Sequence, residues 1–164
     1  MTIEKLIQSL IEELNIELEL DYGMYYFYGS PVSISQQIGR IMSANDKYPA
    51  CILFNEFPEK QGDKLSHFKT EAQLTLYLMT ASSKAWSESK HIDDAVSPMS
   101  LIADMIIEKI EADSRFGDVD DYQKINRTNW GLLVQFGSSK KSVFPDSLSG
   151  VEIKFTLKVK RDYC

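Results

Sequence analysis

The chain has 164 residues, of which 43% are hydrophobic and 26% charged, and its formal net charge at pH 7 is −6. A chain of ~150 residues buries about 70% of the surface that it exposes when unfolded, so one domain over residues 1–164 is expected. The acidic excess argues against a nucleic-acid-binding module, which needs a basic patch. Two cysteines, Cys51 and Cys164, cannot build a disulfide framework or a thiolate metal site, which favours a reducing cytoplasm. No stretch approaches the ~18 apolar residues of a membrane span, so no membrane partner is expected.

The N-terminal residues predict an amphipathic helix followed by a hairpin. Over residues 16–20 the apolar period switches to two, which indicates a strand, and the aromatic run Met24–Tyr28 indicates a second one. The turn between them makes these strands a hairpin, and their tyrosines fit a half-buried strand better than a recognition surface. The helical stripe consists of Ile3, Leu6, Ile7, Leu10, Ile11 and Leu14.

Two longer strands form the centre of the predicted sheet. Residues Pro49–Phe54 are nearly all apolar, and Thr70–Thr80 alternates apolar and polar residues. Before them, a short or broken helix is predicted around Gly39 from four apolar residues at helical spacing. Those four are Ile34, Ile38, Ile41 and Met42.

The second half of the chain predicts one helix and about three strands. After an irregular connection over 82–94, Ser97 as N-cap and Pro98 at the first helical position mark a helix start. Two short strands are predicted between residues 118 and 137, and strict alternation predicts a final strand over Val151–Lys160. The apolar stripe of the helix is Leu101, Ile102, Met105, Ile106 and Ile110.

This order of elements predicts an α+β fold, a mainly antiparallel β-sheet with two principal α-helices packed on one face. Between the two central strands, the charged stretch Phe57–Lys69 has no pattern of its own. Hairpin loops are usually about 2–5 residues, so a longer connection of this kind is usually functional or mobile.

One enzymatic hypothesis comes from Asp146 and from Glu152 and Lys154 on the final strand. A Pro-Asp followed by Glu-x-Lys is the pattern with which restriction-type nucleases bind Mg²⁺ and polarise a phosphodiester. Against it, Glu152 and Lys154 belong to the polar face of an amphipathic strand, and such faces are usually only solvated. The Asp is also close to the Glu along the chain, whereas in those nucleases it commonly comes from a separate strand.

The remaining chemical residues favour no cofactor or metal. His67 and His91 are the only histidines, and neither lies in a ligand pattern. The glycines form no phosphate-binding loop. The basic clusters are Lys140 and Lys141 and, near the C-terminus, Lys154, Lys158, Lys160 and Arg161. We interpret them as a solubilising surface and an edge strand guarded by lysines rather than as a contact to DNA.

The whole pattern resembles the tail terminator, or tail completion, proteins of long-tailed bacteriophages and related prophages. The resemblance covers most of the chain and lies in the order of elements and in short apolar signatures. These are the N-terminal helix, a strand opened by Tyr48-Pro49, the long strand ending near Ala81-Ser82, the helix Leu101–Ile110 and the final strand from Gly150.

The resemblance implies a protein without an active site, which forms a homo-oligomeric ring, typically hexameric. Such a ring caps the tail tube, stops its polymerisation and joins it to the head, so the implied partners are the tail tube protein and head–tail connector proteins. The implied location is the host bacterial cytoplasm during assembly and then the virion tail. Two other hypotheses stay open: a different head–tail connector or tail-assembly factor, and the nuclease.

A ring requires two different complementary patches on each subunit. We expect the stretch Phe57–Lys69, which could order on contact, to supply one of them, together with the polar loop around residue 140. The candidate assembly residues are Phe57, Lys60, Asp63, Lys64, Leu65, His67, Phe68, Lys140 and Lys141.

Overall fold

A computed structural model of the chain describes residues 2–18, 23–130, 135–136, 139–140 and 146–161. Its elements, in chain order, are α1 (Ile3–Leu18), β1 (Tyr25–Gly29), α2 (Pro31–Arg40), a 3₁₀ turn η1 (Ala44–Asp46), β2 (Ala50–Phe54), β3 (Glu59–Gln61), β4 (Phe68–Ala81), α3 (Glu88–His91), a π-helical turn η2 (Ile92–Val96), α4 (Ser97–Ala112), β5 (Asp120–Trp130), β6 (Gln135–Phe136), β7 (Ser139–Lys140) and β8 (Leu148–Lys160).

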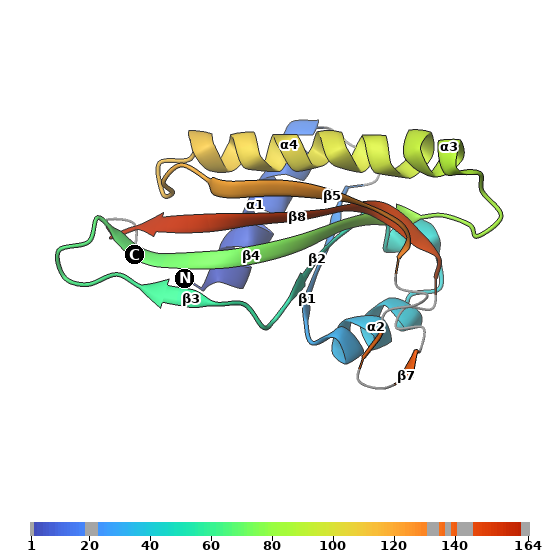
Figure 1. Ribbon diagram of the computed structural model, residues 1–164, viewed down its shortest axis with the longest axis horizontal. Coiled ribbons are helices and arrows are strands. Elements are labelled where there is room, and N and C mark those ends of the chain that lie inside the picture. Colours follow the sequence, from blue (N-terminus) through green and yellow to red (C-terminus); the bar gives the residue numbers. More distant parts are fainter. Residues whose placement is uncertain (1, 19–22, 131–134, 137–138, 141–145, 162–164) are drawn as a thin grey trace.

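The sheet is mixed but mostly antiparallel, as the sequence predicts. Its strand order is β1-β2-β4-β8-β5, and β3 pairs with the beginning of β4; β6 and β7 form a separate small ladder. Among the described strands, only β1 and β2 pair in parallel, and the long strands β4 and β8 pair antiparallel from Phe68 to Ala81. Figure 1 shows these two strands running the length of the molecule.

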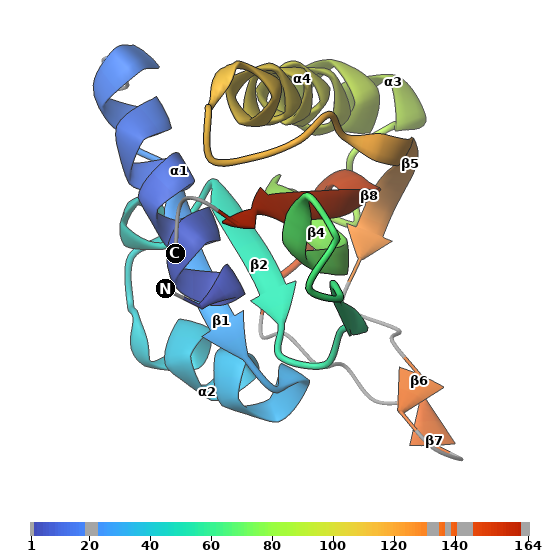
Figure 2. The same ribbon diagram turned by 90° about the vertical axis from the view of Figure 1, so that its left-hand side faces the viewer.

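The two principal helices pack on one face of the sheet, which confirms the predicted α+β arrangement. α4 runs along the long strands while α1 crosses them (Figures 1 and 2). The six predicted stripe residues of α1 are all buried, in one apolar cluster with the inward row of β4. That row is Ala72, Leu74, Leu76 and Leu78, the alternate residues predicted from the sequence.

The opposite face of the sheet carries α2, in the part of the chain where the apolar spacing around Gly39 predicted a helix. Ser30 caps this helix by accepting a hydrogen bond from the Ser33 amide, and Ile34 and Ile38 pack against Phe27 and Ile52 in a second, smaller core. Because α2 connects the parallel strands β1 and β2, the predicted N-terminal hairpin is wrong. The aromatic strand pairs with the strand that follows the helix instead.

The predicted strand over residues 16–20 is also wrong, because α1 continues to Leu18; residues 19–22 lie outside the described part. Asn15 lies inside the helix, and its side-chain amide exchanges two hydrogen bonds with the backbone of Met24, at 2.7 and 2.9 Å. Ile16 then points into solvent and is 77% exposed. The predicted strand rested on three alternating apolar residues, Ile16, Leu18 and Leu20, which are too few to distinguish the period of a strand from that of a helix. The preceding helix continues into this stretch instead.

Ser97 is not the N-cap of α4. Helical backbone begins at Glu88, where Ser87 accepts a hydrogen bond from the Lys90 amide, and it continues through η2 into α4. Pro98 has no amide hydrogen to donate to the preceding turn. The π-helical turn Ile92–Val96 lies just before this position, and such turns occur mostly as single interruptions within α-helices.

The predicted apolar stripe of α4 is partly wrong. Leu101 and Met105 are 64% and 38% exposed, while Met99, Ala103 and Ile107 face the core instead. Ile106 and Ile110 are buried as expected, with Ile102 partly buried. Apolar residues occupy more than half of the positions of this helix and cover more than half of its circumference, so several choices of stripe fit the sequence.

The last two predictions concern β5 and β8. The region for which two short strands were predicted contains β5 and the two-residue β6. Trp130, assigned to the second predicted strand, ends β5, whereas Phe136 lies in β6; residues 131–134 lie outside the described part. The final strand exists, but it lies between β4 and β5 rather than at an edge. Its lysines therefore do not guard an edge of the sheet.

No helix in the described ranges combines the length and the apolar character needed to cross a bilayer.

Candidate functional site

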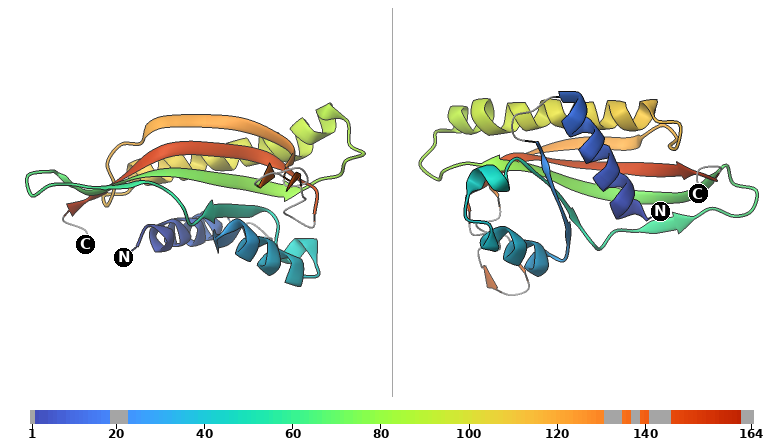
Figure 3. Two further views of the ribbon diagram at one scale, coloured as in Figure 1. Left: turned by 60° about the horizontal axis from the view of Figure 1, so that its bottom comes forward. Right: turned by 180° about the vertical axis from the view of Figure 1, so that it is seen from behind.

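The stretch Phe57–Lys69, which we call the arm, is a hairpin rather than a patternless loop. β3 pairs with the first residues of β4, Glu59 opposite Ala72 and Gln61 opposite Thr70. The arm extends beyond the end of the sheet in every view (Figures 1 and 3). The prediction of a connection without structure is therefore wrong. The three polar residues of β3 pair with β4, but they show no apolar alternation from which a strand could be predicted.

Hydrogen bonds hold the turn of the arm in place. The Gly62 amide donates to the Lys69 carbonyl at 2.9 Å, and the Leu65 amide donates to the Asp63 carboxylate at 2.9 Å. The Arg161 guanidinium donates to the carbonyls of Ser66 and Asp63, at 3.2 and 2.5 Å. A cation at the end of β8 thus ties the tip of the arm to the body.

The seven candidate assembly residues in the arm separate into two groups. Phe57 and Phe68 are half-buried: Phe57 packs against the main core, and the Phe68 ring lies under the Lys158 ammonium, 5.4 Å from it. These two rings anchor the arm. The other five are exposed, with Leu65 the most extreme at 97%; they are Lys60, Asp63, Lys64, Leu65 and His67.

The other two candidates cannot be placed with the arm. Lys140 lies in β7, of which only the backbone is described, and Lys141 lies outside the described residues. The small β6–β7 ladder is drawn near α2, at the opposite end of the molecule from the arm (Figure 1).

A shallow polar groove crosses the sheet face opposite α1 and α4. It has a volume of about 460 Å³, and its charged side chains are Asp121 and Lys154. A smaller hollow of about 180 Å³ adjoins it at Pro58 and includes Phe54 and Tyr77. This surface offers amide and hydroxyl groups, chiefly from Gln73, Thr75, Gln123 and Thr156.

Three aromatic rings cluster beside this groove, next to an ion pair whose carboxylate is buried. The Tyr77 and Trp130 centroids are 4.6 Å apart, and Phe54 lies 5.3 Å from Tyr77. Burial, with the neighbouring Glu152 carboxylate, raises the pKa of Tyr77 to about 12. Glu152 itself is 4% exposed and accepts two hydrogen bonds from Arg127.

Each carboxylate of the nuclease hypothesis has a cation partner of its own. Asp146 lies 2.9 Å from the ammonium of buried Lys47 and accepts a 2.6 Å hydrogen bond from the Tyr48 hydroxyl. Glu152 pairs with Arg127, and Lys154 lies two residues farther along the same strand. A shared Mg²⁺ would have to break both ion pairs. Within the described ranges, no three His, Cys, Asp or Glu side chains are close enough together to hold a metal ion.

The two histidines have different surroundings. His67 lies exposed in the arm, as expected for a loop histidine. His91 is 1% exposed, and its Nδ1 lies 2.9 Å from the Ser149 hydroxyl. Ser149 also donates to Ser82 and accepts from the Asn129 amide, so the group is a buried link between α3 and three strand ends.

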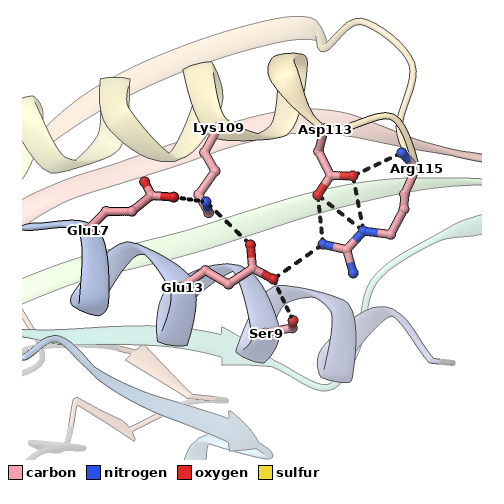
Figure 4. A network of polar contacts seen from close by, with 6 residues as sticks. All are labelled: Ser9, Glu13, Glu17, Lys109, Asp113 and Arg115. Atoms are coloured by element: carbon pink, nitrogen blue, oxygen red, sulfur yellow. Dashed lines mark hydrogen bonds and ion pairs between the residues drawn. The ribbon is translucent and has the colours of Figure 1, made fainter.

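A charged clasp joins the two principal helices (Figure 4). The Lys109 ammonium of α4 lies 2.6 Å from Glu17 and 3.3 Å from Glu13 on α1, and the hydrogen bond to Glu17 raises the pKa of Lys109. The Arg115 guanidinium forms an ion pair with the Asp113 carboxylate at 2.7 Å and a longer one with the Glu13 carboxylate at 3.8 Å. The sequence contains no short-range signal for this clasp, because its partners are far apart in the chain.

Beside the clasp, a groove between α1 and α4 has a volume of about 410 Å³. Leu14, Leu18, Met105 and Ala112 form its apolar part, and Glu17, Glu108, Lys109 and Asp113 form its charged part. The apolar spacing of α4 gave no sign of this surface, because it predicted Met105 in the buried stripe.

The sequence matches no model of a known protein family, and a search of curated proteins found no significant match.

Proposed function

We propose that the chain is a non-enzymatic virion assembly protein of a long-tailed phage or prophage, forming a homo-oligomeric ring that terminates the tail tube and joins it to the head. The protein acts by binding its own copies, the tube protein and the connector proteins. It assembles in the host cytoplasm and remains in the virion tail.

The observation that carries the proposal is the arm, a hydrogen-bonded hairpin that projects past the sheet and presents Leu65 to solvent. Exposed leucines are common singly, but here the residue lies at the end of an ordered projection tied down by Arg161. A projecting element that contacts a different surface of the next copy gives head-to-tail association, and head-to-tail contacts close into rings when the rotation permits. The order of elements that resembles tail terminators supports the same function.

Deletion of the gene from the phage or prophage that encodes it tests the proposal. We expect tail tubes of uncontrolled length without attached heads, seen by electron microscopy, and restoration by the wild-type chain supplied in trans. Virions of normal tail length and normal yield would overturn the proposal. Tails of normal length that fail to join heads would instead identify a connector that acts after termination.

A matched pair of substitutions tests whether the arm carries this role. Leu65→Asp places a charge on the arm tip, and Met42→Asp places the same charge on a residue that is 95% exposed near α2. Neither residue is in the core, so both variants should fold with wild-type stability. We expect Met42→Asp to restore tails and Leu65→Asp to fail; equal restoration by both would remove the arm from the proposal.

A further inference from the structure

The arm and the helical layer have opposite charge, although the whole chain is acidic. Between Glu59 and Lys69 the arm carries three lysines, Lys60, Lys64 and Lys69, against Glu59 and Asp63. None of the three lysines has an ion-pair partner among the described residues. The arm therefore has an excess of one positive charge and presents one almost fully exposed leucine, Leu65.

The helical layer carries a net negative charge. α1 contains four glutamates and one lysine, and α4 contains three acidic residues and one lysine. Both lysine-rich and carboxylate-rich surfaces are on the same chain, at separate places: the arm lies past the end of the sheet, and the groove lies between the helices (Figure 3).

The α1–α4 groove combines an apolar floor with an acidic rim. Met105, at 38% exposure, leaves part of a thioether side chain open at the groove, and Leu14 and Leu18 extend the apolar floor toward α1. Glu17 is neutralised by Lys109, but Glu108 has no cation partner within the described part of the chain. The groove can accept one apolar side chain and one cation beside it.

We infer that the arm tip of one copy docks in the α1–α4 groove of a second copy, with Leu65 over Met105 and Lys64 beside Glu108. Burying Leu65 removes apolar surface from water. The lysine and glutamate at the rim direct the orientation of the contact and disfavour wrong partners. Because the two surfaces differ, each chain both gives an arm and receives one, as a ring requires. The inference rests on the proposed ring for its biological setting, but the contact itself can be tested alone.

Disulfide trapping between two differently tagged populations tests the contact. One population carries Leu65→Cys and the other Met105→Cys; Cys164 is replaced by serine in both, while Cys51 is fully buried at 0% exposure and can stay. We expect a cross-linked dimer that contains one chain of each tag. A disulfide accumulates from transient encounters, so the test needs no stable oligomer.

The control population carries Val32→Cys, on α2, a residue that is 67% exposed and far from the groove in the fold. If Leu65→Cys cross-links to Val32→Cys as well as to Met105→Cys, or only to itself, the docking is wrong. A specific cross-link would appear with Met105→Cys and stay at background with Val32→Cys.

Charge reversal provides a second readout in the same trapping assay. Lys64→Glu on the arm population, or Glu108→Lys on the groove population, should each reduce the cross-link to background. The two reversals combined should restore it, which a general loss of folding could not produce. Failure of the combined variants to recover while both remain folded would overturn the assigned pairing.

The outcomes separate this contact from the proposed function. If the cross-link is specific but deletion of the gene causes no tail defect, the contact between copies stands and the proposed function in tail termination is rejected. A tail defect on gene deletion without any cross-link would keep the role and place the ring contact elsewhere.

Discussion

Arg127 on β5 donates two hydrogen bonds to one carboxylate oxygen of Glu152 on β8, at 2.9 and 2.5 Å. The two partners differ in burial: the Glu152 side chain is 5% exposed and the Arg127 side chain 42%. The Tyr77 hydroxyl also hydrogen-bonds to Glu152. The pair thus fixes a carboxylate under the aromatic stack, at the seam between an edge strand and the central sheet.

This asymmetry predicts that removing the cation costs more than removing the anion. Arg127→Met leaves a buried carboxylate without its ion partner and should lower the free energy of unfolding by about 2–3 kcal/mol, less than for a fully buried pair because Arg127 is partly solvated. Glu152→Gln leaves a cation that water can reach and keeps an acceptor for Tyr77, so about 1 kcal/mol is expected. Urea unfolding of both variants measures the difference.

Equal losses for the two variants would contradict this prediction, because they would mean that Glu152 reaches water as freely as Arg127. The same variants bear on the nuclease hypothesis. A Mg²⁺-dependent DNA cleavage that disappears in Glu152→Gln would revive that activity.

Asp146 predicts an acid-sensitive contribution to stability. Burial raises the pKa of this carboxyl, but hydrogen bonds from Lys47 and Tyr48 and the charge of Lys47 together outweigh burial and hold the pKa below its ordinary value. A carboxyl whose pKa is lower when folded stabilises above its unfolded pKa of about 3.9, and this stabilisation is lost as the pH falls through the folded pKa. Asp146→Asn should therefore cost about 1–2 kcal/mol at neutral pH.

The measurement is the difference in unfolding free energy between wild type and Asp146→Asn, followed from neutral pH into acid. We expect the difference to begin to shrink below about pH 4, where the unfolded carboxyl becomes protonated, and to approach zero once the pH has fallen through the lower pKa of the folded carboxyl. A difference that stays constant with pH would show that Asp146 acts through packing alone. Taking the difference also cancels the titration of other carboxyls, such as Asp113.

The hydrogen bonds around His91 predict its tautomer. Ser149 has one hydroxyl hydrogen and donates it to Ser82, at 2.9 Å. The contact with His91 then requires the histidine to donate from Nδ1. In mildly basic solution, ¹⁵N NMR should show the neutral ring protonated at Nδ1. Protonation at Nε2, an atom that has no partner among the described residues, would reverse the direction of this network.

The sequence correctly predicted those elements whose apolar spacing fits only one kind of secondary structure. The stripe from Ile3 to Leu14 and the alternation in Thr70–Thr80 and Val151–Lys160 each fit one period, and the fold confirms them. The predictions failed where local patterns were compatible with two structures. Residues 16–18 continued a helix already formed, and the apolar residues of α4 cover more than half of its circumference.

Long-range pairing could not be predicted from spacing. The sequence placed strand Met24–Tyr28 beside its predecessor, because neighbouring strands usually pair, whereas α2 carries the chain across to a parallel partner. The arm was identified as a candidate contact from its charge and length. Its hairpin structure, the anchoring roles of Phe57 and Phe68 and the groove between α1 and α4 depend on contacts made after folding.

A side chain at Gly150 should strongly destabilise the sheet. Gly150 pairs with Met79, the third pair from one end of the β4–β8 ladder, where a Cβ would lie 1.9 Å from the Leu78 carbonyl oxygen. An alanine would push apart two strands that carry most of the core, so Gly150→Ala should lower the free energy of unfolding by at least about 2 kcal/mol.

The matched control is Gly39→Ala, in an exposed helical position of α2 with ordinary negative φ. There alanine should raise stability by about 0.5–1 kcal/mol, because it restricts the unfolded chain and favours the helix. Urea unfolding measures both, and a Gly150→Ala variant as stable as wild type would mean that β4 and β8 do not approach so closely at this position.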